Sequence, residues 1–348
     1  FNTNNILNNF ENKRVLITGA TGLLGYNLTN HLIKSKNVHV TAISRSLKKL
    51  RKCFSIHKDN TRFSYIEHDV SSPLYLFDYP VDYIFHAASP QENKIISESP
   101  VDVINANILG TMNCIDFLIN QEIEHNVNGR LVLFSSVTIY GNNTTTNLVV
   151  KETDTSLTEK IESIGASYSQ SKRMSEVIAR AYSKQFNLDV VTSRLSTVYG
   201  DTLIKTDTAF FEFINNAILG QDIHINKSAN PRRDNIYLDD AISGLLLIAL
   251  KGKTNEVYNV SSNGELENFQ AVDEIASIIA EETNKIFGTT RSRVKVINND
   301  FNKVKRQPGI ILDNTKLKKL GWTLKTSFKD GIAKTLQLNI PKTVKKPF

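Results

Sequence analysis

A glycine-rich turn near the N-terminus constrains the fold of this chain more than any other stretch. The segment GATGLLG (19–25) directly follows KRVLIT (13–18), an apolar run of strand length, and opens a helical pattern whose leucines share one face. Such glycines let the chain turn tightly and let the backbone approach a pyrophosphate, while N–H groups at the helix N-terminus bind the anion. The sequence therefore predicts a dinucleotide-binding turn, made by Gly19, Thr21, Gly22, Leu23, Leu24 and Gly25.

Strand-like runs alternate with helical patterns up to about residue 200, which is typical of a mostly parallel sheet with helices on both faces. The fold class is therefore α/β, with a doubly wound parallel sheet. The predicted strands are 13–18, 38–44, 63–70, 81–88, 129–136 and 188–196, and the clearest helices are 101–119 and 168–186.

The pattern loosens in the last third of the chain, where short strands mix with helices. Strands are predicted at 222–225, 256–260 and 293–298, and a helix at 269–282. We expect a cofactor-binding domain over residues 11–200 and a smaller, mostly substrate-binding α/β region over residues 201–340, some segments of which return to the first domain.

Charge and cysteine content narrow the partners and the compartment. The 348-residue chain has a formal net charge of +7, which favours anionic ligands, but its basic residues are spread out and predict no nucleic-acid-binding stripe. Cys53 and Cys114 give neither a disulfide framework nor a metal-ligand spacing, so a reducing cytoplasm and no metal are expected. The longest apolar run, 241–250, is far shorter than the roughly 20 residues of a membrane span, so no membrane partner is expected.

The end of the second predicted strand bears on the choice of cofactor. A carboxylate at this place usually binds the adenosine ribose hydroxyls of NAD, whereas this chain has Ser44, Arg45 and Ser46 there. A guanidinium suits a 2'-phosphate, so Arg45 favours NADP. The alternative is that Arg45 lies over the adenine of NAD.

A tyrosine and a lysine four residues apart form the predicted catalytic pair. Tyr168 and Lys172 fall on one face of the helix 168–186. A tyrosine normally keeps its proton up to a pKa of roughly 10, and a nearby ammonium lowers that value, which makes the phenol a usable general acid or base. The strand 129–136 ends in Ser135 and Ser136, whose hydroxyls are expected beside this pair.

Taken together, these motifs resemble the extended short-chain dehydrogenase/reductase family, and within it the NAD(P)-dependent epimerase/dehydratase group that acts on nucleotide sugars. The resemblance spans roughly residues 11–340 and implies a Rossmann fold. It is carried, in order, by GATGLLG, HDV (68–70), HAAS (86–89), NILGT (107–111), SSVTIYG (135–141), YSQSK (168–172), RLSTVYG (194–200), RRDNIYLDD (232–240) and TKLKKLGW (315–322).

The resemblance also implies roles for individual residues. Tyr168 would be the catalytic base, Lys172 would position the nicotinamide ribose, and Ser136 would hydrogen-bond the reacting sugar hydroxyl. Further cofactor contacts are implied at Asp69, Val70, Ala87, Ala88, Ser89, Asn107 and Leu195. Substrate contacts are implied at Ser89, Thr138, Thr197, Arg233 and Arg306, with the two arginines on the nucleotide diphosphate.

Two of these substrate contacts have an alternative. Arg306 can instead be a surface residue of a basic loop. Thr197 stands where the family often has asparagine, which leaves the geometry of sugar binding open.

The residues after Ser136 bear on the reaction. Related 4,6-dehydratases carry Asp and Glu where this chain has Val137 and Thr138, and related UDP-glucuronate decarboxylases usually carry Glu at the place of Thr138. Neither Val137 nor Thr138 can do carboxylate chemistry, and C4 epimerases have small or hydroxyl residues there. The resemblance therefore implies a C4 epimerase working through a 4-keto sugar.

Other outcomes stay open at this stage. A C4 dehydrogenase or a 4-ketoreductase fits the same residues equally, a decarboxylase or a dehydratase fits them less well, and a non-catalytic binding module is disfavoured by the intact Ser136, Tyr168 and Lys172. Family members usually dimerise through the helices 101–119 and 168–186, so a homodimer is expected.

Overall fold

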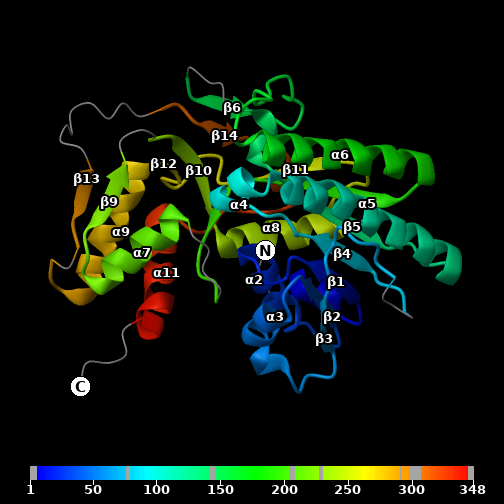
Figure 1. Cartoon of the computed structure of the whole chain (residues 1–348). Coiled ribbons are helices and arrows are strands. Elements are labelled where there is room, and N and C mark those ends of the chain that lie inside the picture. The colour runs from blue at the N-terminus through cyan, green and yellow to red at the C-terminus, as the bar shows by residue number, and fades with distance from the viewer. Residues whose placement is uncertain are drawn as a thin grey trace.

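The central element is a seven-stranded sheet in the order β11-β7-β5-β4-β1-β2-β3 (Figure 1). The computed structural model describes residues 6–75, 79–141, 146–203, 208–226, 230–290, 292–297 and 307–343. All neighbouring strands of this sheet run parallel, which confirms the predicted doubly wound sheet. The strands are β1 (Arg14–Thr18), β2 (His39–Ser44), β3 (Phe63–Glu67), β4 (Tyr83–His86), β5 (Arg130–Ser136), β7 (Asp189–Leu195) and β11 (Val257–Val260).

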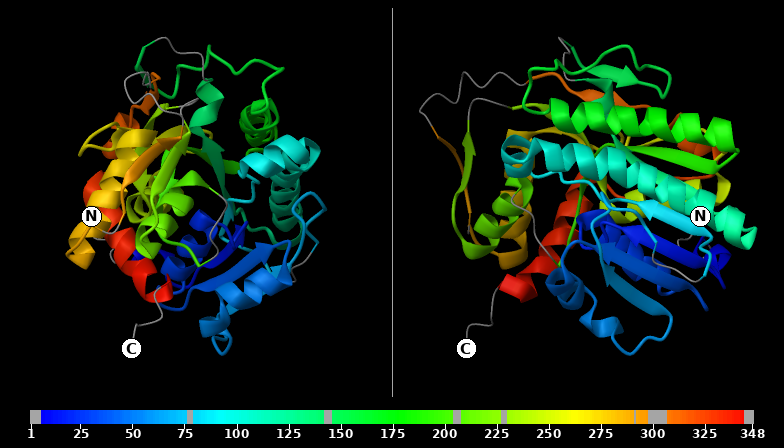
Figure 2. Two further views of the ribbon diagram at one scale, coloured as in Figure 1. Left: turned by 60° about the vertical axis from the view of Figure 1, so that its left-hand side comes forward. Right: turned by 45° about the vertical axis from the view of Figure 1, so that its right-hand side comes forward.

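Helices cover both faces of this sheet, so its central strands are buried on both sides and read as nearly continuous apolar runs (Figure 2). One face packs against α2 (Leu23–Leu32), α3 (Leu47–Cys53), α8 (Leu238–Lys251) and α10 (Thr315–Lys319). The other packs against α5 (Pro100–His125) and α6 (Ala166–Phe186), which lie side by side, and the short α4 (Asn93–Glu98) contacts α5.

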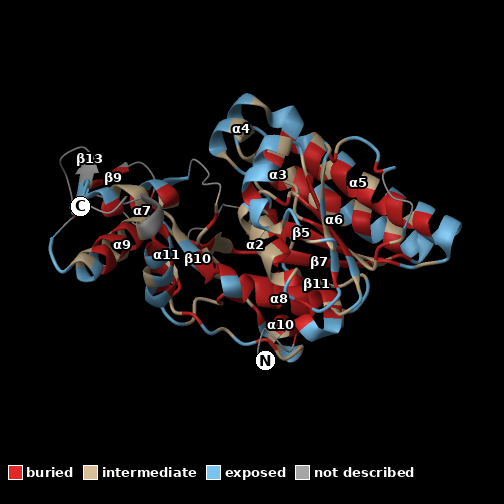
Figure 3. Ribbon diagram, turned by 90° about the horizontal axis from the view of Figure 1, so that it is seen from below, coloured by how far each residue is buried: buried red, intermediate tan, exposed pale blue. Residues whose placement is uncertain are grey.

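A smaller α/β part follows the large sheet and has its own core (Figure 3). It contains two small sheets, β12-β10-β8 and β13-β9, and three helices that pack against one another. Their bounds are β8 (Thr197–Tyr199), α7 (Ala209–Leu219), β9 (Ile223–Asn226), β10 (Arg232–Tyr237), β12 (Phe269–Ala271), α9 (Val272–Phe287), β13 (Val294–Ile297) and α11 (Phe328–Thr343). The intervening α8 and β11 belong to the layers of the large sheet.

The prediction that a helix begins at Phe269 was wrong by three residues. Phe269–Ala271 forms the strand β12, which pairs antiparallel with β10, and α9 begins at Val272. The Glu274 carboxylate accepts the Ala271 N–H at 2.8 Å, which fixes the start of the helix.

The remaining elements are short. Strands β6 (Leu148–Val150) and β14 (Ile310–Leu312) pair over the 3-10 turn η3 (Val137–Tyr140), and the turns η1 (Asn8–Phe10) and η2 (Ser55–His57) lie near the N-terminal strands. Among the helices described, none has both the length and the apolar character to cross a membrane.

Candidate active site

The predicted site residues of the first half of the chain gather at the carboxyl edge of the large sheet. The chain proceeds from β1 outward to β2 and β3, and then returns to place β4 on the other side of β1. Ligands of open parallel sheets bind at such a reversal of strand order, outside the carboxyl ends of the strands.

In the turn after β1, packing requires glycine at two of the three glycine positions. Gly19 has φ of +65°, and a Cβ there would lie 2.6 Å from the Ala88 backbone nitrogen; a Cβ at Gly25 would lie 2.3 Å from the Gly19 carbonyl oxygen. Gly22, by contrast, is exposed and meets only ordinary contacts. It precedes α2 and has no side chain to cap it, so the first N–H groups of the helix have no side-chain cap and would suit a bound pyrophosphate.

Two buried residues that sequence reasoning did not assign hold the turns after β1 and β4 together. The Thr18 hydroxyl lies 2.8 Å from Nδ1 of His86 and accepts the Ala88 N–H at 3.3 Å. Burial lowers the pKa of His86 to about 3, so its imidazole is neutral and acts as a fixed hydrogen-bonding group. Both residues adjoin predicted motifs, at the end of β1 and at the start of HAAS, which was the available signal.

The ends of β2 and β3 come together where the adenosine end of a dinucleotide is predicted. Ser44 lies 2.9 Å from the hydroxyl of Thr21, and Ser46 caps α3 by accepting the Lys49 N–H at 3.3 Å. Arg45 and Asp69 are exposed side chains on neighbouring strand ends.

The Asp69 carboxyl is held ionised in this position. Partial burial raises its pKa, but hydrogen bonds from Ser71 and the charge of Arg45 outweigh that effect, so the pKa lies below its ordinary value. The adjoining Val70 is buried against α5, where its side chain would lie 3.0 Å from a Cβ at Gly110.

The structure brings the three predicted catalytic residues together. Ser136 ends β5, and Tyr168 and Lys172 face it from successive turns of α6; all three are buried. The Lys172 ammonium donates to the Phe134 carbonyl oxygen at 2.7 Å and lies 6.0 Å from the centre of the Tyr168 ring. Thr138 donates to the Ser136 hydroxyl oxygen twice, from its backbone N–H at 3.2 Å and from its own hydroxyl at 3.1 Å.

The expectation that Lys172 lowers the Tyr168 pKa is not met in this structure. Burial raises the pKa of the phenol above its ordinary value, and the nearby hydroxyls of Ser136 and Ser89 offset only part of the rise. The physical reason is that the phenolate would be fully desolvated here, while the lysine is directed to a backbone carbonyl. The Ser89 hydroxyl is buried and makes no hydrogen bond of good geometry with the described residues.

Lys172 is itself strongly perturbed. Burial lowers the pKa of its ammonium to about 7, and the carboxylate of Glu176 opposes that effect. A lysine that titrates near neutrality can change its charge during a reaction, which is common at functional sites.

Asn107 lies at the contact between the two helices of this face. Its side-chain amide donates to the Ser171 hydroxyl at 2.8 Å, which ties α5 to the residue before Lys172. Its Oδ1 atom is buried and has no hydrogen-bond partner among the described residues.

The residues predicted to contact the substrate come from both parts of the chain. Leu195 ends β7, and Thr197 begins β8, where it is paired with Asn235 of β10. Arg233 stands two residues earlier on β10, so Arg233, Asn235 and Thr197 share one face of this small sheet. The Arg233 guanidinium is partly desolvated by surrounding protein, which lowers its pKa, although the residue keeps access to solvent. The predicted contact Arg306 lies outside the described residues.

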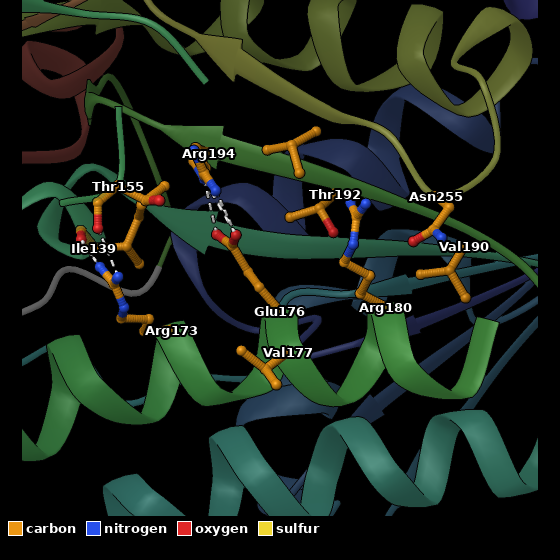
Figure 4. Close-up of a pocket in the computed structure, with 11 residues that line it drawn as sticks. Ile139, Thr155, Arg173, Glu176, Val177, Arg180, Val190, Thr192, Arg194 and Asn255 are labelled. Carbon is orange, nitrogen blue, oxygen red and sulfur yellow. Dashed lines mark hydrogen bonds and ion pairs between the residues drawn. The ribbon is translucent and has the colours of Figure 1, made fainter. Parts of the chain in front are cut away.

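A buried ion pair that joins α6 to β7, one helical turn beyond Lys172, was not predicted. Arg194 of β7 binds Glu176 of α6, with 2.7 Å between Nη2 and Oε2 (Figure 4). Each residue lies in or next to a motif named above. Arg194 begins RLSTVYG, and Glu176 follows the last residue of YSQSK, Lys172, by one helical turn. Their partnership joins segments 18 residues apart in sequence, and spacing alone did not reveal it.

Comparison with known proteins gives the chain a family context. The model of the family described as "NAD dependent epimerase/dehydratase family" matches residues 15–261. UDP-glucuronic acid decarboxylase 6 of Arabidopsis thaliana is 25% identical, over 95% of this chain and 92% of that protein. UDP-glucuronic acid decarboxylase 1 of Danio rerio is 26% identical, over 94% of this chain and 72% of that protein.

Solved structures share the same architecture. UDP-glucuronic acid 4-epimerase from Bacillus cereus, in complex with UDP-glucuronic acid and NAD, superposes with a TM-score of 0.73 at 21% identity and covers 94% of this chain and 99% of that one. dTDP-glucose 4,6-dehydratase from Bacillus anthracis, in complex with NAD, gives a TM-score of 0.74 at 20% identity, with 94% and 96% covered. These likenesses show a common fold.

Proposed function

The chain belongs to the NAD dependent epimerase/dehydratase family, and from that premise we propose that it oxidises a nucleotide-diphosphate sugar at C4, most simply as a C4 epimerase. Tyr168, in its phenolate form, takes the proton of the C4 hydroxyl, Ser136 hydrogen-bonds the same oxygen, and Lys172 binds the nicotinamide ribose. When bound, NAD or NADP supplies the hydride acceptor, and the same hydride returned to the opposite face of the 4-keto sugar gives the epimer. The dehydrogenase and 4-ketoreductase outcomes use the same residues and differ in whether the hydride returns.

The observation that carries this proposal is the environment of Ser136. Thr138 directs both its N–H and its hydroxyl to Ser136, and Val137 carries no ionisable group, so neither offers the acid or base that removal of water needs. Two carboxylates on or before α6 are engaged elsewhere, Glu176 by Arg194 and Glu159 by the Ser169 hydroxyl at 2.6 Å. This arrangement supports oxidation at C4 without elimination.

UDP-glucuronate decarboxylation is the second candidate. Relatives that span nearly the whole chain are named as decarboxylases, at 25% to 26% identity. A C4 ketone is also what a decarboxylation of that sugar acid requires, because it stabilises the charge left on the ring when carbon dioxide leaves. Thr138 in place of a carboxylate is the feature that places this candidate second.

A panel of nucleotide sugars separates these candidates. We expect purified protein, incubated with UDP-, GDP-, CDP- and dTDP-sugars and with NAD or NADP, to convert one of them to a product of equal mass and different retention time. A product two mass units from its substrate would indicate the dehydrogenase or the 4-ketoreductase. Loss of water or of carbon dioxide would reject the assignment based on Val137 and Thr138.

We infer that a dinucleotide binds at this edge of the sheet, because Gly22 leaves α2 without a side-chain cap and its first N–H groups can donate to a pyrophosphate. We infer a preference for NADP from Arg45, whose exposed side chain follows β2. Arg233 is the corresponding candidate for the substrate diphosphate, because it is cationic, accessible and on the same sheet face as Thr197.

A homodimer in a reducing cytoplasm completes the proposal. Both cysteines, Cys53 and Cys114, are buried free thiols, and burial raises the pKa of each, which suits a compartment where disulfides are not formed. The neighbouring α5 and α6 are the proposed dimer face.

A further inference from the structure

Three side chains of α6 contact three consecutive residues of β5. Tyr168, Lys172 and Glu176 recur every four residues and therefore lie along one face of the helix. Ser136 lies at the Tyr168 phenol, and the Phe134 carbonyl accepts from the Lys172 ammonium.

The third contact of this set belongs to Glu176. Its carboxylate accepts a hydrogen bond from the hydroxyl of Ser135, the residue between the other two. The proposed catalytic residues therefore occupy two of three adjacent connections between the same helix and the same strand, and Glu176 makes the third.

Arg194 fixes Glu176 from the opposite side. Its Nε lies 3.0 Å from Oε1 and its Nη2 lies 2.7 Å from Oε2, so the guanidinium holds both carboxylate oxygens. The side chains are only 5% and 12% exposed, and they line a cavity of about 230 Å³ on the side of α6 away from α5 (Figure 4). Buried ion pairs contribute little net stability on average, but removing one partner leaves a charge uncompensated.

The same arginine also reaches the turn that carries Val137 and Thr138. Its Nη1 donates to the Tyr140 hydroxyl at 2.8 Å, at the last residue of η3, and to the Glu152 carbonyl at 2.8 Å. Tyr140 in turn donates to Asn259 of β11 at 2.7 Å. One buried group thus fixes both the helix that carries the base and the turn that follows Ser136.

We propose that Glu176, held by Arg194, is a positioning residue for C4 oxidation: it keeps α6 in register with the end of β5, so that Tyr168 and Lys172 face Ser136. This inference rests on the proposed function for its kinetic consequence. Its structural consequence is that Glu176 acts as a charged partner of Lys172, and this can be tested without any substrate.

The groups that act electrostatically on Lys172 make this consequence measurable. Glu176 is the carboxylate that favours the Lys172 ammonium, and it lies on the same helix. His86 faces the lysine from β4 and is neutral, and Tyr168 faces it in protonated form, because burial lowers the pKa of the first and raises that of the second. Neutralising Glu176 therefore removes the main anionic partner of the ammonium.

The first test is Glu176→Gln, which keeps the side-chain shape and an acceptor for Ser135 but removes the charge. We expect the pKa of Lys172, followed through the 13Cε resonance of labelled lysine in the full-length protein, to fall by about one unit or more. Glu122→Gln removes an exposed carboxylate of α5 and is the matched control, with no expected change. An unchanged Lys172 titration in Glu176→Gln would overturn the proposal, even if no nucleotide sugar were turned over by the wild type.

Kinetics give the second readout. For the active enzyme we expect Glu176→Gln to lower kcat about 10- to 100-fold, to leave KM within about twofold, and to move the alkaline limb of the kcat profile to lower pH. Arg194→Lys keeps a cation but loses the guanidinium that holds both carboxylate oxygens, and it serves as the second variant if Glu176→Gln does not fold. We expect it to lower kcat at least about tenfold. A wild-type kcat and pH profile in Arg194→Lys would contradict the positioning role.

Discussion

The burial of Lys172 has a direct consequence for the stability of the protein. Its pKa lies at about 7 in the folded chain, against an ordinary value of 10.5, because burial disfavours the ammonium. Between these values the unfolded chain holds a proton that the folded chain has released, so stability rises with pH in this window. The destabilising effect is fully present below pH 7.

Replacing this lysine should therefore separate stability from activity. We expect Lys172→Met to abolish turnover but to raise the free energy of unfolding, by on the order of 2 kcal/mol below pH 7, with the gain shrinking as pH rises towards 10. Chemical denaturation at several pH values measures it. Lys184→Met, at the exposed end of α6, serves as control and should change stability by less than about 1 kcal/mol at any pH. A loss of stability in Lys172→Met at pH 6 would show that its bond to Phe134 outweighs the desolvated charge.

The proposed preference for NADP rests on one residue, Arg45. We expect Arg45→Ala to weaken NADP binding about tenfold or more while leaving NAD binding within about twofold, because a guanidinium adds a charge-assisted bond only where a 2'-phosphate is present. Titration calorimetry with both dinucleotides gives the two affinities. Arg51→Ala, at an exposed arginine within α3, is the control. Equal affinities of the wild type for NAD and NADP would refute the preference.

At the scale of elements, the two neighbouring helices α5 and α6 each have a buried face against the sheet and an outer face with exposed apolar side chains. Their inner faces carry Asn107 and the proposed catalytic pair, Tyr168 and Lys172, while their outer positions hold large apolar side chains open to solvent. Exposed apolar side chains on adjoining elements mark interaction surfaces. Those exposed on the two helices are Val101, Ile104, Leu109, Ile123, Met174, Val177 and Phe186.

A dimer that forms through α5 and α6 would cover these exposed apolar side chains. We expect the wild-type chain to be a dimer by multi-angle light scattering, and the double variant Leu109→Glu with Met174→Glu to be a monomer at the same concentration, because each glutamate would be desolvated at the contact. Ile56→Glu, at a still more exposed apolar position on η2, should stay dimeric. A monomeric wild type would remove this part of the account.

At the scale of the whole molecule, the large sheet was predictable because its signals are local. Each buried parallel strand is a run of apolar residues, and the glycine turn follows β1 directly. The helix start at Val272 was not, since β12 exists only through its pairing with β10, which lies more than thirty residues away along the chain. Strand pairing of that kind leaves no periodic trace in the sequence.

The site follows the same division between local and distant information. Ser136, Tyr168 and Lys172 could be chosen because each lies in a short motif, and the fold then places them together. The raised pKa of Tyr168, the neutral His86 beside Thr18, and the Arg194–Glu176 pair all depend on burial among elements that meet only in the folded chain. Sequence spacing indicates which groups are present, and packing decides their protonation.

The central claim is that a hydride leaves C4 and that neither water nor carbon dioxide leaves the sugar. The most direct test uses the nucleotide sugar that the panel identifies, prepared with deuterium at C4, and follows the product by mass spectrometry and NMR. We expect the label to stay at C4 of an epimer whose mass equals that of the labelled substrate. We also expect Tyr168→Phe to bind the cofactor but to form no product. Label found at C6 with loss of water, or a product lighter by carbon dioxide, would contradict it.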